Sequence, residues 1–170
     1  MNSKQVFGFT LIELMVVIAI AGIFMSVALP DFSKMVESYR LKEAVESLKS
    51  DLMFARTEAI KQSRDVAFSR TYGNAGSWCY GLNVDTSCTC TTAGSCAIKT
   101  VSGSNFSSMI NMESAATSNS TFDFRRGTIG ANGVTFSTTN FSSRVVFSDG
   151  GRVRICTPSG ETGLAGYPGC

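Results

Sequence analysis

The chain has 170 residues and a formal net charge of +2, which allows one soluble domain beside a helical anchor and singles out no polyanionic partner. It contains no histidine, which excludes Ser-His-Asp and Cys-His catalysis and histidine-ligated zinc sites. No motif of paired acids is visible either, so the sequence predicts no enzyme and no cofactor.

The first thirty residues carry the most informative pattern. A polar leader with one cation, Lys4, precedes Gly8-Phe9-Thr10-Leu11-Ile12-Glu13-Leu14, and residues 14–29 contain no charge. A bilayer core of ~30 Å needs about 20 apolar helical residues, which residues 9–30 supply. An export signal is normally cut after its apolar core, but the small residue Gly8 precedes it. A carboxylate at the start of such a run is costly in lipid unless paired, so Glu13 is predicted to be functional.

This arrangement resembles the prepilin signature of type IV pilins and type II secretion pseudopilins. The resemblance implies that a prepilin peptidase removes residues 1–8 by cutting between Gly8 and Phe9, and that it methylates the new N-terminus at Phe9. It also implies that Glu13 pairs with the N-terminal amine of a neighbouring subunit, which sets the register in the filament. The alternative is a plain signal anchor with a stray glutamate.

Residues 31–65 are predicted to continue the helix beyond a kink at Pro30. Acidic and basic residues are equally numerous here, which indicates a solvated face rather than a basic recognition helix. A homodimeric coiled coil would show the same apolar stripe, but strand-like segments follow directly, so we expect the stripe to pack on a sheet. Its members recur at steps of four and three: Leu41, Val45, Leu48, Leu52, Ala55 and Ala59. One helix over residues 9–65 would be ~85 Å long.

The junction after this helix gives a second resemblance. Residues 52–63, followed by the strand-like residues 66–69, resemble the helix-to-strand junction of the GspH/FimT family of minor pilins, which has a similar Ala-Arg-x-Glu-Ala-Ile stretch. The resemblance implies an α+β, type IV pilin-like fold: a long N-terminal helix packed on an antiparallel β-sheet head. It implies a single-pass inner-membrane protein with a periplasmic head, which joins other pilin and minor pilin subunits in an extracellular pilus.

Residues 66–156 are predicted to form the β-rich head. Ser- and Gly-rich joints separate short strand-like segments at residues 66–70, 78–84, 97–101, 121–126, 134–137, 144–148 and 152–156. Large aromatic side chains in these segments, Phe68 and Trp78 among them, are predicted to belong to the core.

All six cysteines lie beyond the anchor, where oxidising surroundings favour disulfides. Sequence alone does not choose among the possible pairings. We favour Cys156 with Cys170, which would bound a Gly- and Pro-rich tail of residues 157–170 that is flexible enough to adapt to a ligand. The other four are expected to pair among themselves: Cys79, Cys88, Cys90 and Cys96. A four-thiolate metal site is the alternative, although this spacing is not a usual zinc pattern.

Residues 144–156 form the segment with the most distinctive charge pattern. Two strand-like runs flank Asp149-Gly150-Gly151, which predicts a hairpin. A three-residue loop with a left-handed Gly151 buries Val145, Phe147, Val153 and Ile155 on one face. It then places three arginines on the exposed face without a carboxylate among them: Arg144, Arg152 and Arg154.

Guanidinium groups without acidic partners suit phosphate. Gly151-Arg152-Val153-Arg154 also resembles the Gly-Arg-x-Arg motif of FimT-like minor pilins that bind DNA, which implies contact of Arg152 and Arg154 with double-stranded DNA. Arg144 joins them by strand geometry alone, and at most one of Arg125 and Arg126 can, because adjacent strand residues point opposite ways.

The function expected is therefore that of a minor type IV pilin that binds extracellular DNA weakly, through its phosphates, for uptake in natural transformation. Three phosphate contacts predict a salt slope no steeper than about −2.7. The alternative function is that of a minor pilin or type II secretion pseudopilin which acts only in filament assembly or priming. On that view the hairpin arginines are a solvated surface or contact neighbouring pilins.

Overall fold

The computed structural model describes residues 9–113 and 119–170, including all of their side chains except those of residues 27–31. The leader and the predicted cleavage residue Gly8 therefore lie outside the described residues. The chain divides into two compact units, Met1–Val36 and Glu37–Cys170.

Helix α1 spans Leu11–Gln62 and passes through Pro30 without a break in its assignment. Thr10 caps its first turn, where the Thr10 Oγ1 accepts a hydrogen bond from the Glu13 N–H at 3.3 Å. At the other end Ser63 takes a φ of 53°, in the left-handed region, directly after the last helical residue. Within the described part of the chain, none of the helical segments has both the length and the hydropathy of a membrane span.

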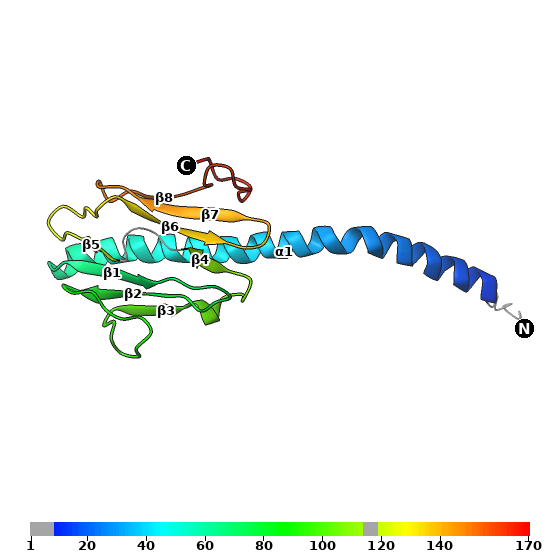
Figure 1. Ribbon diagram of the computed structural model, residues 1–170, viewed down its shortest axis with the longest axis horizontal. Helices are drawn as coiled ribbons and strands as arrows, with labels where there is room; N and C mark the ends of the chain where they lie inside the picture. The colour runs from blue at the N-terminus through cyan, green and yellow to red at the C-terminus, as the bar shows by residue number, and fades with distance from the viewer. Residues whose placement is uncertain (1–8, 114–118) are drawn as a thin grey trace, which may run out of the picture. The chain divides into compact units, whose positions relative to one another are not determined.

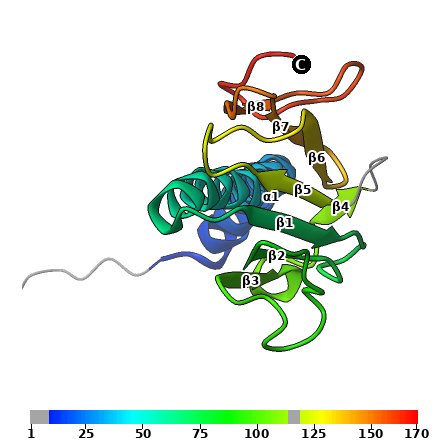
Figure 2. The same ribbon diagram turned by 90° about the vertical axis from the view of Figure 1, so that its left-hand side faces the viewer.

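In the described part of the chain, eight strands form two antiparallel sheets of four, which confirms the predicted α+β class. The first has the order β3-β2-β1-β5, with β1 at Val66–Thr71, β2 at Cys79–Val84, β3 at Lys99–Ser102 and β5 at Asn119–Phe122. The second has the order β4-β6-β7-β8, with β4 at Asn111–Glu113, β6 at Asn132–Ser137, β7 at Ser142–Phe147 and β8 at Val153–Cys156. A short 3₁₀ helix, η1, spans Gly103–Asn105. Both sheets lie beside residues 37–62 of α1, the part of the helix that belongs to the second unit (Figures 1 and 2).

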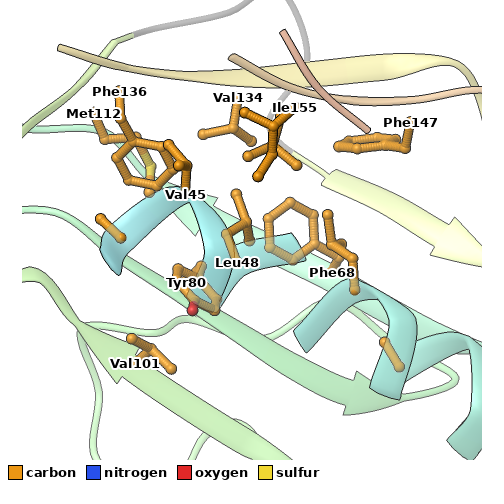
Figure 3. Packing of buried hydrophobic residues seen from close by; sticks show 14 of the residues in the cluster. Val45, Leu48, Phe68, Tyr80, Val101, Met112, Val134, Phe136, Phe147 and Ile155 are labelled. Carbon is orange, nitrogen blue, oxygen red and sulfur yellow. The ribbon is translucent and has the colours of Figure 1, made fainter. Parts of the chain in front are cut away.

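The predicted apolar stripe of α1 is the centre of the core. All six of its members are fully buried, and Figure 3 shows Val45 and Leu48 between side chains of the two sheets. Phe68 and Tyr80 come from the first sheet, and Val134, Phe136, Phe147 and Ile155 from the second. The helix thus packs on sheets, as predicted. Every residue of this core cluster lies in the unit Glu37–Cys170.

Three disulfides close loops of the head. Cys156 pairs with Cys170, the pairing that the sequence favours. The other four cysteines pair as Cys79–Cys90 and Cys88–Cys96, so their thiols form disulfides and not a thiolate metal site. Gly81 of β2 gives these bonds room, since a Cβ there would collide with the Cys96 sulfur.

The C-terminal tail is held in place, which corrects the expectation that it is a flexible loop. The Ser142 N–H donates to the Thr162 carbonyl at 2.8 Å, and Leu164 is buried. The Tyr167 hydroxyl donates to Glu46 of α1 at 2.6 Å. A Gly- and Pro-rich composition indicates only which backbone conformations are accessible. It does not predict tertiary contacts of this kind.

A buried polar group ties α1 to the first sheet. Asp51, 6% exposed, accepts hydrogen bonds from the Tyr80 hydroxyl at 2.8 Å and from the Lys99 ammonium at 2.6 Å. Burial, opposed by a hydrogen bond from Ser47, raises the pKa of Tyr80 well above its usual range, and the Asp51 charge adds to this. The buried Asp51 carboxylate therefore receives its hydrogen bonds from one residue of β2 and one of β3.

Removing one of these partners should weaken the head. Tyr80→Phe leaves Asp51 buried with one donor fewer, and we expect a loss of about 1–3 kcal/mol in the free energy of unfolding by urea. Tyr39→Phe is the matched control, because Tyr39 is 62% exposed on the same helix and should change stability little. Equal effects of the two substitutions would contradict this account of Asp51.

Attachment of the tail should depend on pH. The hydrogen bond from Tyr167 lowers the pKa of Glu46 below 4.5; burial opposes the shift and Lys49 adds to it. Since the folded pKa is depressed, the stabilisation is complete above pH 4.5 and is lost as the pH falls through the folded value. Thermal unfolding should thus show the cost of Tyr167→Phe shrinking upon acidification to about pH 3. A cost independent of pH would refute the role of this contact.

Candidate functional site

The N-terminal site begins at the first described residue. Phe9, the predicted new N-terminus, is 82% exposed, and every described side chain from Phe9 to Ser26 is exposed. Glu13 lies in the first turn of α1 and is exposed too. An exposed apolar helix with a carboxylate near its start has the surface expected of a subunit that packs against other helices.

The β7–β8 hairpin has the predicted register and loop. Phe147 pairs with Val153, and the Ser148 N–H donates to the Arg152 carbonyl at 3.1 Å, which leaves residues 149–151 as the loop. Gly151 has a φ of 73°, the left-handed conformation that a three-residue loop needs. Val145, Phe147 and Ile155 are buried, as this register requires, whereas Val153 is only partly buried and packs against the core cluster.

Arg152 and Arg154 lie on the outer side of this hairpin and are exposed. Together with Val146 and Ser148 they line a hollow of about 150 Å³. Neither arginine forms an ion pair with a described residue. The nearby Asp149 uses its Oδ1 to accept a hydrogen bond from the Ala131 N–H at 2.7 Å. Two guanidinium groups that have no ion-pair partner among the described residues thus line one hollow, an arrangement chemically suited to an anion.

Arg144 shares this strand face but does not converge with the other two arginines. Its side chain crosses the neighbouring strand β6, where its Nε would lie 2.5 Å from a Cβ built on Gly133. That Nε is buried without a hydrogen-bond partner among the described residues. The missing side chain of Gly133 makes room for the guanidinium, and β6 lies on the opposite side of β7 from β8.

Arg125 and Arg126 lie in a turn, which corrects the prediction of a strand over residues 121–126. Strand β5 ends at Phe122, and Asp123 Oδ1 accepts hydrogen bonds from the N–H groups of Arg125 at 2.8 Å and Arg126 at 3.0 Å. An aspartate that binds backbone groups two and three residues on favours a turn over a strand. The argument from alternating strand faces therefore does not apply, and both arginines are exposed.

Sequence reasoning missed Arg56, which it assigned to the solvated face of the helix. The Arg56 Nη1 makes a long hydrogen bond of 3.5 Å to the Gly151 carbonyl. Gly127 and Gly151 both have positive φ, of 61° and 73°, and Arg56 packs against both glycines. In Figure 1 the end of α1, the loop after β5 and the β7–β8 turn gather at one end of the head.

A groove of about 510 Å³ lies between α1 and the hairpin. The helix contributes Met53, Arg56, Thr57 and Ile60, and the hairpin contributes Gly150, Gly151, Arg152 and Val153. Arg152 lines both this groove and the smaller hollow, so it stands between them. The groove combines an apolar lining with two cations.

The Gly151 backbone should tolerate no side chain. A Cβ at Gly151 would collide with the Gly127 carbonyl oxygen in addition to adopting a left-handed φ. We expect Gly151→Ala to lower the free energy of unfolding by at least about 1 kcal/mol. Gly150→Ala is the control, since a Cβ at Gly150 meets no atom within 4 Å. Similar unfolding midpoints for the two variants would show that the turn adapts.

Two protein-family models match the chain. The family model for type II transport protein GspH matches residues 44–162, and the model for the prokaryotic N-terminal methylation motif matches residues 3–29. A search of curated proteins finds no match.

One solved structure shows the same fold. A crystal structure of the type IV minor pilin FimU from Pseudomonas aeruginosa (strain PAO1) has a TM-score of 0.53 and 21% sequence identity, covering 71% of this chain and 91% of that chain. A second crystal form of that protein has a TM-score of 0.48 and 19% identity, covering 67% and 90% of the two chains. The first likeness shows the fold, and the family model covers more than half of the sequence. The chain therefore belongs to the GspH family, as a GspH/FimT-like minor pilin or pseudopilin with an N-terminal methylation motif.

Proposed function

We propose that this minor pilin is incorporated in a type IV pilus and binds extracellular DNA for uptake in natural transformation. The observation that supports DNA binding is the pair Arg152 and Arg154, both exposed, without an acidic partner among the described residues and lining one hollow. Guanidinium groups bind phosphate through paired hydrogen bonds that match its geometry.

Binding of this kind is weak and insensitive to base sequence. Contacts to phosphates carry no direct sequence information. Each neutralised phosphate contributes about −0.9 to the slope of log affinity against log salt, so Arg152 and Arg154 give a slope near −1.8.

Maturation and assembly follow the N-terminal motif. A prepilin peptidase cuts between Gly8 and Phe9 and methylates Phe9, and the helix then holds the subunit as a single-pass protein in the inner membrane. In the pilus, the Glu13 carboxylate pairs with the N-terminal ammonium of a neighbouring pilin. The exposed apolar side chains of Phe9–Ser26 support this role, because lipid or other helices must cover them.

A second function has its own support. The same exposed helix would serve a minor pilin or type II secretion pseudopilin that only primes or caps a filament, with no DNA contact. In that case deletion abolishes piliation or secretion, while the purified protein has no affinity for DNA.

The arginine pair can be tested by substitution. The full chain in a non-ionic detergent should retard duplex DNA in low salt, and Arg152→Gln with Arg154→Gln should abolish the shift without changing the unfolding midpoint. Lys34→Gln with Arg40→Gln removes the same charge from exposed positions of α1 and should leave the shift intact. Unchanged binding by the hairpin variant would overturn the proposed site.

A further inference from the structure

The groove between α1 and the hairpin differs from the strand face on which sequence reasoning placed the arginines. It brings together Arg56 of the helix and Arg152 of the hairpin, residues that are far apart in the chain. Arg152 also lines the hollow that holds Arg154. The three cations therefore follow one another from the groove across the hairpin, and Arg144 is not among the lining residues of either cavity.

The Arg56 guanidinium retains donors for a ligand. Its Nη1 makes the long bond to the Gly151 carbonyl, and its other nitrogens have no acceptor among the described residues. These nitrogens are not among the buried unpaired atoms of the described chain, unlike the Arg144 Nε. Arg56 forms no ion pair with a described residue, so its charge is available in the groove.

The remaining lining of the groove is largely apolar. Met53 is 55% exposed and Ile60 is 52% exposed, and both line the groove beside Arg56. A nucleic-acid strand presents phosphates alternating with apolar sugar faces. Cations beside exposed apolar side chains complement both of these parts, whereas a free inorganic anion would use the cations alone.

We propose that the groove holds a stretch of DNA backbone, with Arg56 as a further phosphate-binding residue beside Arg152. This inference rests on the proposed function, and it moves the binding surface from the hairpin face alone to the cleft between hairpin and helix. Arg56 and Arg152 contact two adjacent phosphates from the two walls, and the sugar between these phosphates lies against Met53 or Ile60. Continuity through Arg152 joins this contact to the one made by Arg154.

The test uses the full chain in non-ionic detergent and a fluorescent DNA duplex, with affinity measured at several salt concentrations. Arg56→Gln should weaken binding and make the salt slope shallower by about 0.9, because one phosphate contact is lost. Arg56→Lys should retain most of the slope, since a cation remains at the groove. Arg40→Gln is the control, a helical arginine that pairs with Glu43 instead.

A second pair of variants tests the groove without touching an arginine. Met53→Glu puts a negative charge into it, whereas Phe54→Glu puts the same charge on the next residue, which is exposed but does not line it. We expect Met53→Glu to weaken DNA binding at least tenfold, and Phe54→Glu to weaken it much less. This comparison decides the matter even if Arg56→Gln disturbs the hairpin.

The possible outcomes distinguish a failure of the groove proposal from a failure of the proposed DNA-binding function. No DNA binding by the unaltered chain would refute the proposed function itself. Binding that needs Arg152 and Arg154 but is unaffected by Arg56→Gln and Met53→Glu would refute only the groove. Variants that bind DNA normally but fail to enter pili would also refute it, because the groove would then be an interface between subunits.

Discussion

The apolar stripe of α1 is the constraint on which the head is built. Six small or branched side chains at steps of four and three are fully buried. They contact one sheet through residues such as Phe68 and Tyr80, and the other through residues such as Val134 and Phe147. One helix therefore packs against both sheets through this stripe. Its remaining faces carry the charged residues. Every loop that bears a candidate function is positioned by the strands that this stripe supports.

Patterns that repeat along the chain were enough to predict much of this fold. The helical stripe, the three-residue hairpin loop and the buried face of β7 all follow from local periodicity and turn chemistry. The three-residue strand β4 was missed because it is too short to show alternation. The strand predicted over residues 121–126 was too long, because Asp123 caps a turn that hydrophobic patterning alone does not register.

The candidate site was less predictable, since it depends on contacts between distant segments. Alternation placed Arg144 on the correct strand face, but the space above Gly133 decides where its guanidinium goes. Arg56 looked like one of many charges on a helix. Its importance comes from two left-handed glycines, Gly127 and Gly151, which bring separate turns close to it. Arg56, Gly127 and Gly151 lie far apart in the sequence, and only the tertiary fold brings them together.

The distribution of the core has a consequence for the head. All residues of the main hydrophobic cluster, and all three disulfides, belong to the unit Glu37–Cys170. None of these stabilising contacts comes from the apolar first half of α1. The head is therefore a module whose core and covalent cross-links are complete without any contribution from residues 9–36.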